Sequence, residues 1–241
     1  MDLVGNMFSF TIASMLAAFV FFYMAQSQVA PKYRMSLIVS GLVVGIAAYH
    51  YFRILHSWEA YQAGTSDFND AYRYVDWLLT VPLLLVELVL VLGLTKDRDN
   101  GLLTKLVVAA AAMIALGYPG EIMDAADKTT MFGAYGLWGT LSSIPFVYIV
   151  WTLWGKLGEA MEDQPERVGV LVRNIRLLLL ATWGFYPIVY CLPFMGFDLA
   201  AAETAVQVGY TIADVLAKAG YGVMIFAIAR AKSEADGWSP S

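Results

Sequence analysis

The chain contains little charge and a single cysteine. Of its 241 residues only 15% are Asp, Glu, Lys or Arg, whereas 59% are hydrophobic, and the mean hydropathy is +0.62. This balance excludes an ordinary soluble domain and is typical of a protein that crosses a membrane several times. The single cysteine, Cys191, excludes an internal disulfide. The net charge is −5 and the sequence has no basic patch, so we predict no nucleic-acid partner.

Apolar stretches long enough to cross a bilayer occur seven times along the chain. A membrane-spanning helix needs about 20 apolar residues, and the stretches cover residues 7–29, 35–56, 72–94, 102–119, 131–155, 171–195 and 205–230. The first has no basic segment before it and is too long for the apolar core of a signal peptide, so we expect it to be retained. We therefore predict an all-α bundle of seven transmembrane helices in a lipid bilayer. We expect one domain over residues 1–241, with a short polar tail from about residue 231.

The basic residues predict the orientation of this bundle, because cytoplasmic loops keep more Lys and Arg than external loops. With the N-terminus outside, the external side receives Arg53, Arg73 and Lys128. The cytoplasmic side receives Lys32, Arg34, Lys96, Arg98, Lys105, Lys156, Arg167, Arg173, Arg176, Arg230 and Lys232. We therefore predict an external N-terminus and a cytoplasmic C-terminus. The longest loop, 57–71, then faces outside, and its Gly64-Thr65-Ser66 centre favours a small hairpin.

The seventh stretch contains two charged residues, Asp214 and Lys218, inside an otherwise apolar run. A charged side chain at mid-membrane costs about 2.5 to over 10 kcal/mol, so each is a candidate functional residue. The two are four residues apart, which places them on one helix face, about 6 Å apart along the axis. On the predicted topology Asp214 lies on the external side of the lysine.

The third stretch contains a line of ionisable and polar residues. In its sequence RYVDWLLTVPLLLVE, the separations between Arg73, Asp76, Thr80 and Glu87 are three, four and seven, so all four fall near one helix face. Arg73 is outermost, and Glu87 lies about 16 Å beyond Asp76 toward the cytoplasm. The sequence therefore predicts a row of polar groups that crosses much of the bilayer.

Two interpretations of these charges are open. In the first, Asp214 and Lys218 form a structural ion pair, which leaves Asp76 and Glu87 unexplained. In the second, Lys218 and Arg73 balance the two aspartates. Glu87, alone in an apolar environment, then carries a proton, because such surroundings disfavour the charged carboxylate. We favour the second interpretation, which makes Glu87 a neutral proton donor that can be reloaded.

Three segments in three helices carry a resemblance to microbial rhodopsins, the light-driven seven-helix retinal proteins. The retinal-attachment segment of that family is similar to DVLAKAGYG, its counterion helix to RYVDWLLTVPLLLVE and its sixth-helix aromatic segment to WGFYPIVY. The resemblance extends over essentially the whole chain. It implies that Lys218 carries all-trans retinal as a protonated Schiff base.

The same resemblance implies a role for each carboxyl group. Asp76 is the expected primary proton acceptor and counterion, Asp214 the second counterion and Glu87 the cytoplasmic proton donor. Together with Thr80, Asp76 and Glu87 form the acid-threonine-glutamate pattern of proton-pumping proteorhodopsins and xanthorhodopsins. The patterns of the sodium and chloride pumps are different. Photosensory members commonly lack a carboxyl donor at the Glu87 position, although a carboxylate there does not exclude signalling.

His50 occurs in AAYHYFRI, near the external end of the second stretch. A lone membrane histidine is more often a structural hydrogen-bonding residue between helices. Its position is similar to that of the histidine that pairs with the acceptor aspartate in proteorhodopsins and xanthorhodopsins. We therefore favour a His50–Asp76 pair in which the imidazole tunes the acceptor.

Several aromatic and small residues are expected to enclose the retinal. By composition alone the aromatic ones are ordinary core residues, but the resemblance makes them the walls of the chromophore pocket. The predicted set is Trp77, Leu84, Met113, Ser142, Trp183, Tyr186, Pro187 and Tyr190. Leucine at position 84 is typical of green-absorbing members.

Gly139, in LWGTLSS, stands where bacteriorhodopsins carry a tryptophan. A small residue that permits close helix packing is one interpretation. The surrounding sequence is similar to that of xanthorhodopsins, in which a glycine here opens a lateral window beside the retinal ring. On that resemblance we predict that a carotenoid antenna binds across the outer face of the fifth and sixth helices.

The sequence thus predicts a light-driven outward proton pump, an ion transporter rather than an enzyme, without a metal site. One alternative is a photosensory rhodopsin that signals through a partner. Another is a non-retinal seven-helix transporter or receptor that uses Asp214 and Lys218 as a binding pair. The resemblance further implies a homo-oligomer, a pentamer or hexamer, in a prokaryotic plasma membrane.

Overall fold

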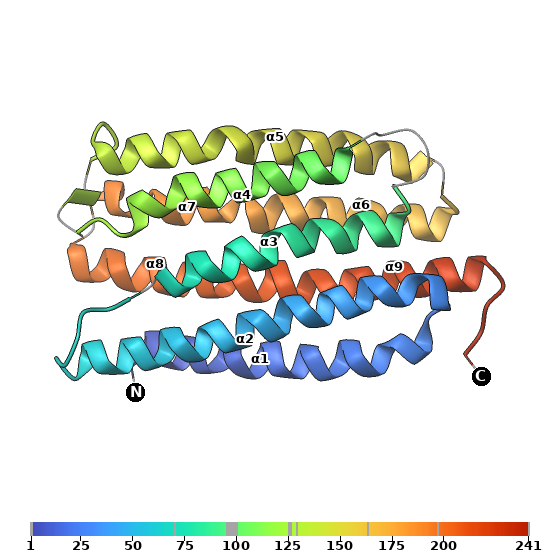
Figure 1. Ribbon diagram of the computed structural model, residues 1–241, viewed down its shortest axis with the longest axis horizontal. Coiled ribbons are helices and arrows are strands. Elements are labelled where there is room, and N and C mark those ends of the chain that lie inside the picture. The colour runs from blue at the N-terminus through green and yellow to red at the C-terminus, as the bar shows by residue number, and fades with distance from the viewer. Residues whose placement is uncertain are drawn as a thin grey trace.

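The computed structural model describes residues 2–69, 71–94, 101–124, 127–128, 130–162, 164–196 and 198–240. Within these ranges, seven helical spans are long and apolar enough to cross a membrane, and they run side by side along the long axis of the molecule (Figure 1). The described residues contain no strand. This confirms the predicted all-α seven-helix fold. Lys96 and Arg98, which entered the orientation argument, lie outside the described residues.

Four of the seven helical spans, the second, fourth, fifth and seventh, are longer than the apolar stretches that predicted them. The first five spans contain α1 (Leu3–Ala25), α2 (Arg34–Gln62), α3 (Ala71–Leu92), α4 (Leu102–Glu121) and α5 (Ala134–Glu162). The sixth contains α6 (Glu166–Trp183) and α7 (Phe185–Tyr190), and the seventh contains α8 (Leu199–Asp214), a π-helical turn (Val215–Gly220) and α9 (Tyr221–Ala235). Hydropathy marks the part of a helix within the hydrocarbon, whereas hydrogen bonding continues into its charged ends. The predicted bounds therefore differ from the observed ones by up to seven residues, the largest difference being at the C-terminal end of the fifth span.

The prediction of a small hairpin around Gly64 was wrong. Gly64 has a φ of +68° and follows the last residues of α2. Its N–H donates to Tyr61 O, and the N–H of Thr65 donates to Ala60 O, both at 3.0 Å. This pair of bonds is a Schellman motif, in which glycine takes the left-handed conformation that ends a helix. The glycine therefore closes α2 rather than joining two strands.

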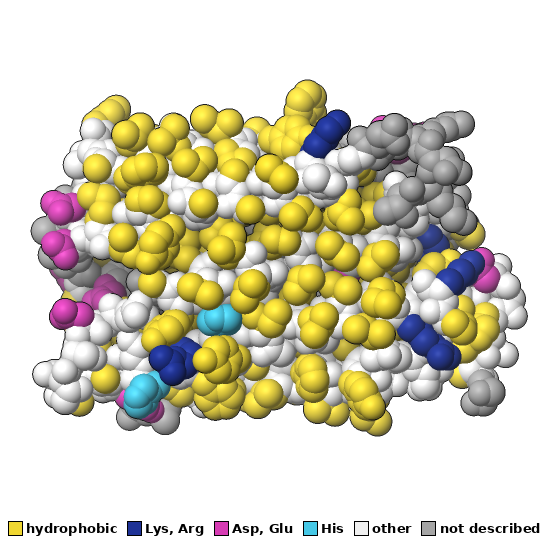
Figure 2. All heavy atoms as spheres, in the orientation of Figure 1, with side chains coloured by type: hydrophobic (Ala, Val, Ile, Leu, Met, Phe, Trp, Pro, Cys, Tyr) yellow, Lys and Arg dark blue, Asp and Glu magenta, His cyan; other side chains and the backbone are white. Residues whose placement is uncertain are grey.

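The centre of the bundle is formed by α3, which packs against α2, α4 and α9. In the most apolar part of the α3 span 56% of the residues are buried, compared with 17% for the α5 span, so α5 presents most of its side chains to the surroundings. Hydrophobic side chains cover the face shown in Figure 2, and acidic side chains gather at the end of the bundle where the N-terminus lies. We call this the N-terminal end; α3 and α8 also begin there, and the C-terminus lies toward the opposite end (Figure 1).

Candidate functional site

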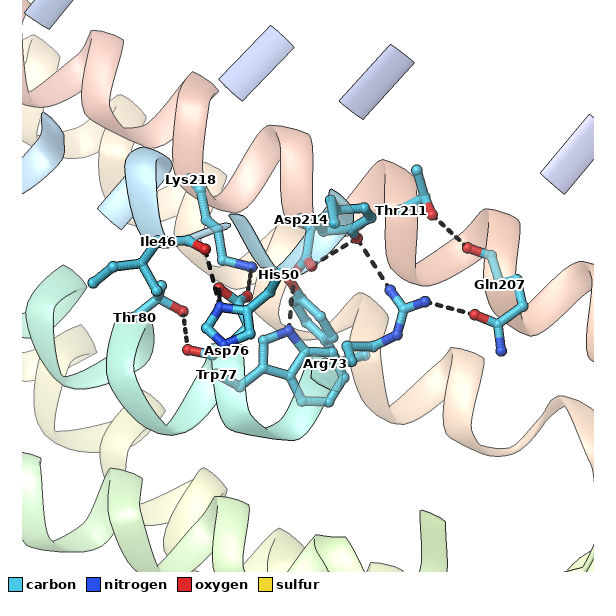
Figure 3. Close-up of polar contacts among 12 residues, drawn as sticks. Ile46, His50, Arg73, Asp76, Trp77, Thr80, Gln207, Thr211, Asp214 and Lys218 are labelled. Carbon is cyan, nitrogen blue, oxygen red and sulfur yellow. Dashed lines mark hydrogen bonds and ion pairs between the residues drawn. The ribbon is translucent and has the colours of Figure 1, made fainter. Parts of the chain in front are cut away.

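Lys218 and two aspartates form a buried cluster inside the bundle (Figure 3). The Lys218 Nζ atom lies 2.8 Å from Asp76 Oδ2 and 2.7 Å from Asp214 Oδ1. Each of the three residues is at most 2% exposed. The structure thus brings α3 and the seventh span together at the lysine. An amine held between two carboxylates at this depth can hold and exchange a proton.

The backbone that carries Lys218 is not α-helical. Val215–Gly220 form a π-helical turn between α8 and α9. Such turns are rare and occur frequently at functional sites. This turn was not predicted, because DVLAKAGYG contains no proline and has no local signal that separates a π-turn from an α-helix.

The two aspartates differ in their other partners. Asp214 accepts hydrogen bonds from the Tyr51 hydroxyl (2.8 Å), the Trp77 indole N–H (3.0 Å) and the Tyr186 hydroxyl. In the part of the chain that the structure describes, the carboxylate oxygens of Asp76 accept no hydrogen bond from a neutral donor, and their close contact is the ion pair with Lys218. Three neutral donors favour the charged form of Asp214, whereas Asp76 lacks such donors.

His50 and Thr80 lie next to Asp76. The His50 Nδ1 atom is 3.7 Å from Asp76 Oδ1 and 3.0 Å from the Ile46 carbonyl oxygen. The Thr80 hydroxyl donates to the backbone carbonyl of Asp76 (2.9 Å), not to its carboxylate. His50 is therefore placed to interact with the charge on Asp76, and its role as acceptor partner stays a prediction.

Arg73 extends the cluster toward the N-terminal end. Its Nη1 atom donates to the Tyr51 hydroxyl (3.0 Å) and its Nη2 atom to the Gln207 side-chain oxygen (2.5 Å). A chain of hydrogen bonds thus runs from Asp214 through Tyr51 and Arg73 to Gln207 (Figure 3). Neither Tyr51 nor Gln207 was predicted as a site residue. A signal for Gln207 was present, since it lies two helical turns before Asp214 in an apolar run.

Glu87 lies on the same helix in a different environment. It is fully buried, and the Ser40 hydroxyl donates to its carboxyl group. Apolar core residues on its own helix flank it, among them Leu84, Leu88 and Val91. Among the described residues no cation forms an ion pair with Glu87. A single hydroxyl in an apolar core suits an uncharged carboxyl group better than a carboxylate.

A cavity of about 220 Å³ opens beside Lys218. The predicted chromophore contacts that line it are Trp77, Leu84, Met113, Gly139, Ser142, Trp183, Tyr186, Pro187 and Tyr190. Tyr74 and Tyr210 also line it and were not predicted. The lining is mostly apolar, with a primary amine at one place. These residues fit an apolar molecule that carries a carbonyl group able to condense with Lys218 Nζ.

Gly139 lies against Tyr190 at the wall of this cavity. A Cβ atom at position 139 would lie 2.5 Å from Tyr190 Cε1. The Tyr190 ring stacks on Tyr135 with centroids 4.2 Å apart and planes at 4°, and each hydroxyl donates to the backbone carbonyl of the other residue. The glycine therefore permits the close approach of a tightly held aromatic pair.

Comparisons with known proteins agree with this geometry. Residues 2–232 match the family model described as bacteriorhodopsin-like protein. The green-light absorbing proteorhodopsin of Gamma-proteobacterium EBAC31A08 is 31% identical over 95% of this chain and 87% of its own length. Among solved structures, xanthorhodopsin, described as a light-driven ion pump with dual chromophore, is 58% identical with a TM-score of 0.88, covering 98% of this chain and 96% of its own. A thermophilic rhodopsin is 51% identical with a TM-score of 0.86 and the same coverage.

Proposed function

Because the chain belongs to the bacteriorhodopsin-like family and is a type 1 microbial rhodopsin, we propose that it is a light-driven outward proton pump with all-trans retinal on Lys218. The observation that carries this proposal is the placement of three carboxyl groups. Asp76 and Asp214 meet Lys218 Nζ, and Glu87 lies on α3 about 16 Å beyond Asp76. Proton transport needs such groups on both sides of the lysine.

Retinal bound to Lys218 supplies light absorption and the isomerisation that follows it. The chain supplies the proton path. Lys218 Nζ holds the transported proton, and Asp76 Oδ2, 2.8 Å away, is the group that takes it. Asp214 keeps its negative charge because three side chains donate to it. Glu87, which keeps its own proton beside Ser40, later returns one to the lysine nitrogen.

The direction of transport follows from the orientation that we propose, with the N-terminal end outside. Asp76 then lies on the external side of Lys218 and Glu87 on the cytoplasmic side, so each turnover moves a proton outward. Leu84 lines the cavity, and we infer green absorption from it. We also propose one domain over residues 1–241, assembled as a pentamer or hexamer in a prokaryotic plasma membrane.

Pigment formation and pumping test this function together. Purified apoprotein incubated with all-trans retinal is expected to gain a visible absorption band, and Lys218→Ala is expected to remain colourless. Lys105→Ala, which removes an exposed lysine, is the matched control and keeps the band. Illuminated cells acidify an unbuffered medium, and a protonophore removes the signal. Alkalinisation contradicts the direction, whereas a slow photocycle without a pH change favours a photosensory function.

We further propose a carotenoid as a second chromophore at Gly139. The cavity lining extends past Gly139 to Thr140 and Ser143 on α5 and to Phe194 beyond α7. The similar xanthorhodopsin is described as having a dual chromophore. A large side chain at position 139 would meet the Tyr190 ring, whereas glycine leaves that ring as the wall, against which an apolar polyene binds while losing little hydration. The carotenoid would lie across the outer face of α5 and the sixth span, beside Tyr190.

The action spectrum of pumping tests the antenna. Pigment is incubated with hydroxylated carotenoids, purified and illuminated at wavelengths that the carotenoid absorbs. Pumping in this range is expected for the native protein and not for Gly139→Trp, with the retinal band present in both. If no carotenoid co-purifies and both spectra coincide, Gly139 only permits the packing of Tyr190.

A further inference from the structure

The buried guanidinium of Arg73 lies between the Tyr51 hydroxyl and the Gln207 side-chain oxygen. The side chain is 1% exposed, and the rings of Phe8, Tyr51 and Tyr210 surround its guanidinium carbon at 5.9, 5.6 and 5.3 Å from their centroids. One guanidinium nitrogen binds the Tyr51 hydroxyl, which in turn donates to Asp214. The other binds Gln207. The bond to Tyr51 therefore holds the guanidinium toward the carboxylate cluster, and the bond to Gln207 holds it toward the N-terminal end (Figure 3).

Gln207 is built into the bundle rather than placed at its surface. It is 2% exposed, and its backbone carbonyl accepts a hydrogen bond from the Thr211 hydroxyl at 2.7 Å. It lies seven residues before Asp214 on α8, which is two turns or about 10.5 Å along the axis. Its side-chain oxygen thus reaches Arg73 from the N-terminal end without adding a charge.

We propose that Gln207 is a positioning residue for proton transfer. Its amide oxygen fixes how far the Arg73 guanidinium lies from Asp76 and Asp214, and this distance sets how readily Asp76 accepts and releases its proton. The inference rests on the proposed pump, because it concerns the acceptor of that pump.

The physical reason is the steep dependence of a charge interaction on distance in a protein interior. At an effective dielectric constant of about 20, moving a unit charge from about 4 Å to about 6 Å from a carboxylate changes its proton affinity about tenfold. A neutral amide holds the cation without competing for it as a carboxylate would. A residue that changes the charge at position 207 therefore changes the protonation of Asp76 without touching Asp76.

Two substitutions at this position are expected to have opposite effects. Gln207→Met has nearly the same shape but no oxygen, so the guanidinium relaxes toward Tyr51 and the aspartates and keeps Asp76 charged to lower pH. Gln207→Glu draws the guanidinium outward and adds a negative charge, so Asp76 takes up its proton at higher pH. The measured quantity is the pH of the colour transition of the retinal pigment. We expect shifts of about one pH unit, downward for Gln207→Met and upward for Gln207→Glu.

Gln62→Glu is the matched control, because it makes the same chemical change at an exposed residue near the end of α2. It is expected to leave the transition unchanged. A general loss of packing moves both Gln207 variants in the same direction, so shifts of the same sign, or no shift, overturn the inference. If Gln207→Glu does not fold, Gln207→Asn replaces it, and its shift must have the sign of Gln207→Met and be smaller.

The failure of the proposed pump and the failure of this inference are distinguishable. If the unchanged apoprotein stays colourless with retinal, both are wrong. If the pigment forms and the titrations of the variants coincide with that of the unchanged protein, only this inference is wrong.

Discussion

On the N-terminal side of Lys218 the bundle holds Arg73, Asp76 and Asp214 in one network of hydrogen bonds and ion pairs. On the C-terminal side Glu87 is buried among apolar residues, with Ser40 as its hydrogen-bonding partner. The first arrangement stabilises several charges at once, because each ion has partners of opposite sign or a donor. The second stabilises a single neutral acid. One helix, α3, can therefore carry both a carboxyl group in a charged network and a neutral buried one, because its two halves pack against different neighbours.

The largest effect is expected from a substitution in the charged network on the N-terminal side of Lys218. Asp76→Asn removes the carboxylate that lies 2.8 Å from Lys218 Nζ. Pumping is expected to stop, and the absorption band to move to the red while the lysine nitrogen remains protonated, because a negative charge next to that proton is lost. The measurements are light-driven acidification and the absorption spectrum. Asp67→Asn, at an exposed position in the loop after α2, is the control and keeps both.

The next largest effect is expected from a substitution of Glu87 in the apolar region on the C-terminal side of Lys218. Glu87→Gln keeps the shape and the contact with Ser40 but removes the carboxyl proton of the proposed donor. Colour is expected to stay nearly unchanged, since Glu87 is too distant to act as a counterion, and reprotonation of the lysine nitrogen to slow by about 100-fold. Flash photolysis measures that rate. The assignment of the two carboxyl groups is wrong if Glu87→Gln moves the absorption band as far as Asp76→Asn does.

A smaller effect is expected from a substitution of His50, which lies beside Asp76 in the charged network. His50→Asn removes an imidazole whose Nδ1 atom lies 3.7 Å from Asp76 Oδ1. The pH of the colour transition is expected to change by about one unit or less, because the imidazole contributes one neighbouring group among several. Spectrophotometric titration of the variant and the unchanged protein gives the comparison. Coinciding titration curves would assign His50 to helix packing.

The smallest effect is expected at the surface of the C-terminal end. The Lys32 ammonium, 2.8 Å from Asp236 Oδ2, holds the pKa of the Asp236 carboxyl below its ordinary 3.8, and Tyr33 also donates to this oxygen. The contribution of this pair to the free energy of unfolding is therefore present above about pH 4 and is lost as the pH falls through the lowered value. Both side chains are substantially exposed, so the contribution is below about 1 kcal/mol.

Thermal unfolding of Asp236→Asn at two pH values measures this contribution. At pH 7 the variant is expected to be slightly less stable than the unchanged protein, and near pH 2 the difference should vanish. Its photocycle is expected to stay unchanged. If Asp236→Asn slowed reprotonation as much as Glu87→Gln, a second acid would share the C-terminal path and the contrast between the two halves would no longer hold.

The class of fold and the ionisable residues of the membrane spans could be predicted from the amino-acid sequence alone. Seven apolar stretches are enough to predict seven helices, because a bilayer forces each span to satisfy its backbone hydrogen bonds internally. The spacing between Asp76 and Glu87 and that between Asp214 and Lys218 follow from the helical repeat, which is a local property. The residues expected to contact a chromophore were predicted from the family resemblance, and all of them line one cavity; their role stays a prediction.

Which polar groups meet could not be predicted in this way, because it depends on how the helices pack. Ser40 and Glu87 are 47 residues apart, Arg73 and Gln207 are 134 apart, and Tyr51 and Asp214 are 163 apart. The helical repeat states which face each side chain occupies, but not which helix that face opposes or at what height. The packing of α2 and α8 around α3 supplies that information. For the same reason Gly139 is a small residue in the sequence, and its contact with the Tyr190 ring exists because α5 and α7 approach each other at that point.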